Sequence, residues 1–267
     1  MPDQDLENTI TEMILLQNMG TDSEEKGMSD PVAAIEPADV DERLVVFHRP
    51  RSIESEYFRF VKHRIEQQME AKETGKGKVI LVTGPNLGVG KSTCSINLAM
   101  VFARSYGNKI LFLDADTRRG TSRRYLGIKE DDFPGFVDVV TMKQKAEEVL
   151  LNTGLFDMDY FPSGQFNDAF IDDIRGNELL NLINSLREKY SYVIIDAPPA
   201  FPMPETAIIA QHCDGVFIVL RAGRDGREDL EQAKEALEGA YIMGVILNAV
   251  KTTPGQRYGS YGYYGKR

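Results

Sequence analysis

The chain has little of several features that would indicate its class directly. It has no tryptophan, only two cysteines among 267 residues, and no apolar run that approaches the ~20 residues needed to cross a bilayer. Cys94 and Cys213 have neither metal-site spacing nor the number for a disulfide framework, so we expect small, buried, reduced thiols. The first twenty residues begin acidic, which is not typical of a signal peptide. These absences favour a cytoplasmic globular protein.

The net charge of −10 is concentrated at one end of the chain. Residues 1–43 contain twelve acidic residues and two basic ones, which accounts for the whole excess. The rest of the chain is balanced, so a broad nucleic-acid-binding surface is not expected and no nucleic-acid partner is predicted. Residues 1–43 lack a sustained hydrophobic period, and we interpret them as an acidic, mostly disordered leader.

One short pattern interrupts this leader. Four apolar residues fall on one helical face: Leu6, Ile10, Met13 and Ile14. Such a face is typical of a helix that docks on a partner. A transient helix with no role is the simpler interpretation of so short a pattern, and it is the one we favour.

Short apolar runs alternate with helical patterns from residue 44 to residue 250. Runs without polar alternation predict buried strands at residues 78–83, 110–113, 158–161, 192–195, 216–220 and 245–247. Helical patterns occur at residues 52–70, 92–106, 171–190 and 227–240. This alternation predicts an α/β fold, a doubly wound and mostly parallel sheet with helices on both faces. Ligands bind such sheets at the carboxyl ends of the strands.

A glycine-rich loop, GPNLGVGKST at residues 84–93, joins the strand 78–83 to the following helix. Backbone N–H groups of such a loop converge on phosphate oxygens at a helix N-terminus. Lys91 is expected to neutralise the β- and γ-phosphates of ATP, and the Ser92 hydroxyl to ligate Mg²⁺. The predicted nucleotide site comprises Gly88, Val89, Gly90, Lys91, Ser92 and Thr93. A glycine-rich turn with a helix-capping serine is the alternative.

Two further strands end in aspartate. Asp114 and Asp116 follow the strand 110–113, and their spacing of two places both carboxylates on one side of an extended segment. Carboxylates there can hold a magnesium-bound water and take the proton of an attacking hydroxyl. Asp196 ends the strand 192–195 and is typical of the acid behind a magnesium ion. Each aspartate alone is equally explained as a helix cap or turn residue. Three motifs in this order predict a phosphate and metal site.

These motifs resemble those of the bacterial tyrosine kinases (BY-kinases), the cytoplasmic kinases of capsule and exopolysaccharide export. The resemblance covers residues 50–267 and is carried by GVGKST at 88–93, LDADTRRG at 113–120, IIDAPP at 194–199 and a C-terminal tyrosine cluster. It places the chain in the MinD/ParA-like branch of P-loop proteins. That branch often has a signature lysine where this chain has Asn86, and the usual loop glycine is replaced by Pro85.

The resemblance implies roles for several of these residues. Lys91, Asp114 and Asp116 would be catalytic, and Mg²⁺ would be bound by Ser92, Asp114 and Asp196. Asn248 stands where relatives often contact adenine, with a simple turn residue as the alternative.

EYFRFVK at residues 56–62 is similar to the family's Glu-x-x-Arg-x-x-Arg oligomerisation helix, which would assign subunit contacts to Glu56, Arg59 and Lys62. Lysine at the last position cannot make the bidentate contact of arginine. A solvated surface helix is the alternative.

The C-terminal residues 251–267 contain four of the eleven tyrosines, four basic residues and no acid. Glycines between the tyrosines disfavour a helix or strand, so we predict a flexible tail. In the company of an ATP site, its tyrosines are predicted to accept phosphate: Tyr258, Tyr261, Tyr263 and Tyr264. An adhesive aromatic tail without that role is the alternative.

We therefore predict a Mg²⁺- and ATP-dependent protein-tyrosine autokinase that phosphorylates its own tail in trans within a ring-like homo-oligomer and regulates exopolysaccharide polymerisation and export. The resemblance implies a separate membrane chain-length regulator, which activates the kinase and recruits it to the inner face of the membrane, and a tyrosine phosphatase. A MinD/ParA-like positioning ATPase is one alternative, disfavoured by Asn86 and by the tail. A non-catalytic scaffold gated by ATP is another.

Overall fold

The computed structural model describes residues 35–70, 77–105, 107–129, 133–167 and 169–251. The leader pattern around Leu6 and Ile14 lies outside the described residues. So do the tail tyrosines, namely Tyr258, Tyr261, Tyr263 and Tyr264. None of the helices in the described ranges has both the length and the apolar character required to traverse a membrane.

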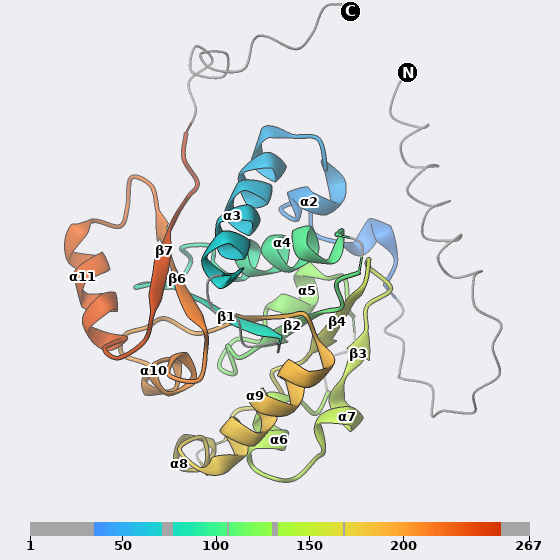
Figure 1. Ribbon diagram of the computed structural model, residues 1–267, viewed down its shortest axis with the longest axis vertical. Coiled ribbons are helices and arrows are strands. Elements are labelled where there is room, and N and C mark those ends of the chain that lie inside the picture. Colours follow the sequence, from blue (N-terminus) through green and yellow to red (C-terminus); the bar gives the residue numbers. More distant parts are fainter. Residues whose placement is uncertain (1–34, 71–76, 106, 130–132, 168, 252–267) are drawn as a thin grey trace, which may run out of the picture.

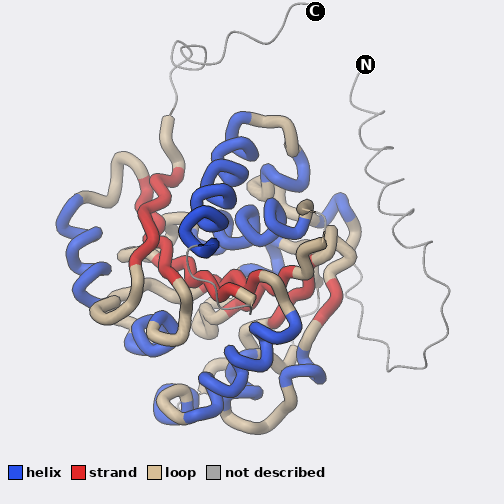
Figure 2. Tube along the Cα trace, viewed as in Figure 1, coloured by secondary structure: helices blue, strands red, loops and turns tan. Residues whose placement is uncertain are grey.

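A seven-stranded sheet runs through the middle of the described fold (Figures 1 and 2). The strands lie in the order β3-β4-β2-β5-β1-β6-β7. Every neighbouring pair is parallel except β3 and β4, which are antiparallel. The strands are β1 (Lys78–Thr83), β2 (Ile110–Asp114), β3 (Leu151–Asn152), β4 (Met158–Phe161), β5 (Tyr192–Asp196), β6 (Gly215–Arg221) and β7 (Ile242–Asn248).

Helices cover both faces of this sheet (Figure 1). One face carries α2 (Val45–His48), α3 (Ile53–Glu70) and α4 (Lys91–Ala103). The other carries α6 (Phe136–Val140), α8 (Ala169–Asp173), α9 (Asn177–Lys189), α10 (Pro204–Ala210) and α11 (Arg227–Ala236). The remaining elements are the 3₁₀ turn η1 (Pro37–Asp39), α5 (Ser122–Tyr125) and α7 (Ala146–Val149).

Side chains of β1 show why the strands are apolar throughout. Ile80 and Val82 join the buried cluster on the α3–α4 face, whereas Val79 and Leu81 join the cluster beneath α9. A strand covered on both faces has no solvent-facing position and therefore no polar alternation. The predicted doubly wound α/β fold is confirmed.

Some element boundaries differ from the sequence prediction. The helix expected at 171–190 is two helices, α8 and α9, because the chain turns at Gly176. Gly176 is the N-cap residue of α9, and its extended backbone separates the two helices. The helices expected at 92–106 and 227–240 are α4 and α11, which end earlier, at residues 103 and 236, and β7 begins three residues before the expected position 245. The two-residue strand β3 and the one-turn helices are too short to give a periodic pattern.

Part of the segment assigned to the acidic leader packs on the folded body. Val40 is buried, and the buried side chain of Asn97 on α4 binds the backbone of residues 43–46. Its amide nitrogen donates to the carbonyl of Arg43 at 3.0 Å, and its oxygen accepts from the N–H of Val46 at 2.9 Å. The folded body therefore begins before residue 44.

Candidate functional site

The three predicted motifs lie at the carboxyl ends of three adjacent strands, β1, β5 and β2. The phosphate loop follows β1, Asp196 ends β5, and Asp114 ends β2. Asp114 and Asp196 are direct partners in the β2–β5 register, so their side chains belong to one site. The topology brings together residues that are more than eighty positions apart in the sequence.

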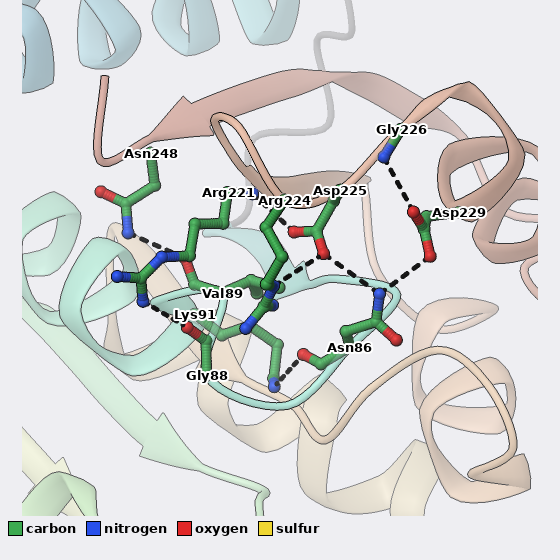
Figure 3. Close-up of polar contacts among 10 residues, drawn as sticks. All are labelled: Asn86, Gly88, Val89, Lys91, Arg221, Arg224, Asp225, Gly226, Asp229 and Asn248. Carbon is green, nitrogen blue, oxygen red and sulfur yellow. Dashed lines mark hydrogen bonds and ion pairs between the residues drawn. The ribbon is translucent and has the colours of Figure 1, made fainter. Parts of the chain in front are cut away.

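The phosphate loop is shaped by two glycines with positive φ, Gly88 at 71° and Gly90 at 99°. Gly90 immediately precedes α4, and a Cβ there would lie 2.0 Å from the amide nitrogen of Asn248. A larger residue here would displace the Asn248 side chain and would strain the backbone at its positive φ. Lys91 is only 6% exposed, and its Nζ lies 3.5 Å from the carbonyl oxygen of Asn86, within its own loop (Figure 3).

The aspartates form a buried acidic centre beside Lys91. Asp114 and Asp196 are fully buried, and Asp116 is 5% exposed. Asp114 Oδ1 accepts the N–H of Asp116 at 3.0 Å, and Asp196 Oδ2 accepts the hydroxyl of Ser122 at 3.2 Å. The remaining carboxylate oxygens, Asp114 Oδ2 and Asp196 Oδ1, have no hydrogen-bond partner among the described residues. Such oxygens are suited to a cation.

Burial shifts the protonation equilibria of this centre. It raises the pKa of Asp196 to about 6, although hydrogen bonding from Ser92 and the charge of Lys91 oppose the shift. Burial, reinforced by the charges of Asp196 and Asp116, raises the pKa of Asp114 well above its ordinary value. Burial likewise raises the pKa of Asp116 and lowers that of Lys91. A cation that neutralises the carboxylates would therefore be bound favourably here.

The donor set suits magnesium in particular. In the described ranges, no three side chains of the His, Cys, Asp and Glu types converge into a complete metal cage. Mg²⁺ is typically held by one or two carboxylates together with substrate phosphates and water. Ser92, which contacts Asp196, and the two buried aspartates supply such an incomplete set.

An ion pair that the sequence did not indicate supports the loop after β2. Glu205, at the start of α10, is completely buried, and its Oε1 accepts from Nε of Arg118 at 3.0 Å. The other oxygen, Oε2, has no partner among the residues described. No sequence pattern marks Glu205 as part of the site, because its partner lies 87 positions away.

The end of β6, the loop that follows it and the first turn of α11 hold the phosphate loop on the side away from the aspartates (Figure 3). Arg221 Nη1 donates to the carbonyl oxygen of Gly88 at 3.1 Å. The side-chain nitrogen of Asn86 donates to Asp225 at 3.1 Å and to Asp229 at 2.9 Å. Asn86 stands where MinD/ParA-like proteins often have a signature lysine, and here it is bound to carboxylates of its own chain. These contacts were also not predicted.

Asn248, predicted to contact adenine, lies against the phosphate loop. Its amide nitrogen donates to the carbonyl oxygen of Val89 at 2.8 Å, and its oxygen accepts the N–H of Ala249 at 2.8 Å. The side chain therefore braces the loop from the end of β7. A contact with adenine stays a prediction.

The three charged residues of the predicted oligomerisation helix lie on α3. Glu56 and Arg59 form an ion pair one turn apart. Lys62 pairs with Glu66 at 2.8 Å, and its ammonium lies 5.6 Å from the centre of the Phe102 ring on α4. The structure thus brings Glu56 and Arg59 together and directs Lys62 toward the body of the protein.

Asp196→Asn tests the cost of burying this carboxylate. Without a cation, Asp196 stays protonated up to about pH 6 in the folded chain, whereas an unfolded chain releases that proton near pH 4. The Asp196 contribution to the free energy of unfolding therefore falls as pH rises from about 4 to about 6, by at most about 3 kcal/mol. The substituted amide would carry no charge, so the variant should melt higher than wild type at pH 7.5 in nucleotide- and magnesium-free buffer and lose this advantage toward pH 4.

Asp173→Asn, at an exposed position of α8, is the matched control for thermal melts across this pH range. A difference between Asp196→Asn and wild type that does not change from pH 4 to pH 8 would contradict the assigned burial cost.

Comparison with known proteins places the chain in a family. Residues 77–239 match the AAA-domain family. The tyrosine-protein kinase CpsD of Streptococcus agalactiae is 34% identical over 218 residues, which cover 79% of this chain and 90% of CpsD. The putative tyrosine-protein kinase EpsB of Ralstonia solanacearum is 31% identical over 207 residues, 75% of this chain but only 27% of EpsB.

Solved structures agree with these relatives. The crystal structure of the chimerical protein CapA2B2 has a TM-score of 0.71 at 26% identity, covering 83% of this chain and 95% of the other. The phosphate loop, the acidic centre and the similarity to these kinases lead to one conclusion. The chain belongs to the bacterial tyrosine-kinase family of P-loop proteins.

Proposed function

We propose that the chain is a protein-tyrosine kinase of capsule or exopolysaccharide export, which transfers the γ-phosphoryl group of ATP to its own C-terminal tyrosines. Its kinase relatives and its P-loop fold support the activity. The observation that carries the proposal is Asp116, a nearly buried carboxylate with a raised pKa beside Lys91 at the end of β2. A positioning ATPase is not favoured by these relatives.

The residues support a direct transfer. The phosphate loop and Lys91 orient the γ-phosphate, and Asp116 accepts the proton of the acceptor hydroxyl. The tyrosine oxygen forms a bond to the γ-phosphorus while the bond from that phosphorus to the β–γ bridging oxygen breaks, and ADP leaves. A raised pKa makes Asp116 a stronger base than an exposed aspartate.

Magnesium, held by Ser92, Asp114 and Asp196, would offset the charge of the phosphates. The buried carboxylate oxygens without hydrogen-bond partners among the described residues support this assignment. Asp116 stays available as the base because its carboxylate is the most exposed of the three.

We assign the acceptor role to Tyr258, Tyr261, Tyr263 and Tyr264 of a neighbouring subunit. The tail of about seventeen residues could span on the order of 55 Å if extended, which is ample for a neighbour's site. Return to its own site would require a tight reversal soon after β7, which ends at Asn248. Transfer in trans is therefore geometrically easier.

A mixing experiment tests this function. One chain carries Lys91→Met with a normal tail, and the other is active but has all four tail tyrosines replaced by phenylalanine. Incubated together with Mg-ATP, the Lys91→Met chain should gain phosphotyrosine on its tail, because the second chain supplies the active site. The readout is mass spectrometry of the separated chains.

Two controls accompany the mixture. The Lys91→Met chain incubated alone with Mg-ATP should gain no phosphotyrosine. A Lys234→Met chain, changed at a lysine outside the site, should gain as much phosphotyrosine as wild type. If the tail of the Lys91→Met chain stays unlabelled although wild type consumes ATP, the kinase assignment fails and a positioning ATPase or an ATP-gated scaffold takes its place.

A ring-like homo-oligomer would bring each tail to a neighbour, and α3 is the surface we assign to it. A groove of about 750 Å³ separates α3 from the edge strand β7. Tyr57 and Phe60 on α3 are 59% and 58% exposed, and Leu247 on β7 is 56% exposed. Large apolar side chains exposed together, next to the Glu56–Arg59 ion pair, are typical of a subunit contact.

Simultaneous replacement of Glu56, Arg59 and Lys62 by alanine should shift the protein toward monomer, because it removes the Glu56–Arg59 ion pair beside this surface and the lysine that follows it on α3. Light scattering coupled to size-exclusion chromatography measures the change. A Glu231→Ala/Lys234→Ala variant, which removes an ion pair on α11, should not alter the mass. An unchanged oligomer, or a wild type that is monomeric in every nucleotide state, would exclude this role for α3.

Further partners follow from the same proposal. A separate membrane chain-length regulator would activate the kinase and recruit it from the cytoplasm to the inner face of the membrane. A tyrosine phosphatase would remove the phosphates from the tail tyrosines.

A further inference from the structure

A second pocket lies beside the acidic centre, at the carboxyl ends of β2 and β4. Its volume is about 330 Å³, and it is formed by the loop 117–120 after β2 and the loop 162–166 after β4. The two strands are parallel neighbours. In the order β4-β2-β5-β1, this pocket and the phosphate loop lie on opposite sides of Asp114 and Asp196. An acceptor that approaches Asp116 from the β4 side therefore passes this pocket.

The lining of the pocket is basic and aromatic. Three arginines contribute to it, namely Arg118, Arg119 and Arg123, and so do three aromatic residues, namely Phe133, Tyr160 and Phe166. The Arg118 guanidinium lies 4.5 Å from the centre of the Phe166 ring. No carboxylate lines the pocket among the residues that the structure describes. This combination suits a ligand with an aromatic ring and an anionic group.

Arg119 connects the pocket to the reacting centre. It is exposed and forms no ion pair with any residue in the described ranges. Its charge lowers the pKa of Asp116 and of Lys91, so its guanidinium lies within electrostatic reach of both. Tyr160, at the base of the pocket, is buried, and its hydroxyl lies by Asp114. The pocket and the acidic centre therefore share a wall.

The chemistry of the tail identifies the anion. Residues 251–267 contain four basic residues and no acidic one, so the unmodified tail offers the arginines no anionic side chain. After phosphoryl transfer, each phosphotyrosine carries nearly two negative charges and three acceptor oxygens on an aromatic ring. We propose that this pocket binds a phosphotyrosine already formed on the tail. The inference rests on the proposed kinase function and extends it to the order in which the tyrosines react.

Spacing supports simultaneous occupancy of the pocket and the reacting centre. Neighbouring strands lie ~4.8 Å apart, so the end of β4, which borders the pocket, is about 5 Å from the end of β2, where Asp116 lies, and about 10 Å from the end of β5. Tyr261 and Tyr263 are two residues apart, so an extended segment bound here would present both on one face with a separation of ~7 Å. A phosphate on Tyr263 held by the arginines would thus leave Tyr261 near Asp116. The first phosphorylation then accelerates the next one.

A binding measurement separates this inference from catalysis. Two synthetic peptides of residues 252–267, one unmodified and one phosphorylated only at Tyr263, are titrated by calorimetry into the full chain with its four tail tyrosines changed to phenylalanine. ADP is present to fill the phosphate loop, and ATP is absent. The phosphorylated peptide should bind at least about tenfold more tightly, because arginine–phosphate contacts are charge-assisted.

Arg119→Gln should lower the affinity for the phosphorylated peptide about tenfold. Arg119→Lys should restore only part of the lost affinity, because lysine cannot make the bidentate contact of arginine with phosphate. Arg124→Gln is the matched control: it removes an exposed arginine of α5 that does not line the pocket, and it should bind as wild type does. Melting curves confirm that each variant is folded. Phenyl phosphate should displace the phosphorylated peptide more effectively than inorganic phosphate does, because only the former has a ring for the aromatic wall.

Equal affinity for the two peptides, or an Arg119→Gln variant that binds as tightly as Arg124→Gln, would overturn the inference. Equal competition by inorganic phosphate would also overturn it, since the pocket would then be a general anion site. None of these outcomes depends on phosphoryl transfer. If the tail is phosphorylated in the mixing experiment but binding fails here, only the inference about the pocket is lost.

Discussion

The pairing of β2 with β5 places two carboxylates, Asp114 and Asp196, side by side at the ends of buried strands, and the site is built around that contact. Removal of a charged carboxylate from water costs on the order of several kcal/mol unless a partner compensates it. Lys91 compensates in part, although burial lowers its pKa and so disfavours its charged form as well. The centre therefore has an excess of negative charge that a phosphate-bound cation would neutralise. The buried carboxylates lower the stability of the empty protein, and binding of nucleotide and metal would restore that stability.

The order of the strands places different parts of the site on the two sides of the buried aspartates. Arg221 at the end of β6 and Asn248 at the end of β7 brace the phosphate loop on one side. On the other side, Asp114 ends β2 and Asp116 follows it, and the arginine-lined pocket lies beyond them over β4. Nucleotide and acceptor are thus assigned to opposite sides of the acidic centre.

Much of this arrangement could be predicted because it is encoded locally. Continuous apolar strands, a glycine loop before a helix and aspartates at strand ends are all patterns within about ten residues. They are sufficient for the fold class and for the placement of Lys91, Asp114 and Asp196. The contacts of Glu205 with Arg118 and of Asn86 with Asp225 join residues 87 and 139 positions apart. Such contacts depend on tertiary structure alone, and the break between α8 and α9 at Gly176 depends on one turn within an otherwise helical pattern.

The central claim is that ATP consumed at this site becomes phosphotyrosine. The most direct measurement is to incubate the purified wild-type chain with Mg-ATP and to map every phosphorylated residue by mass spectrometry, while ADP release is recorded in the same sample. We expect phosphate on Tyr258, Tyr261, Tyr263 and Tyr264, in an amount that accounts for the early release of ADP. Steady ADP release with no phosphotyrosine anywhere on the chain would contradict the account.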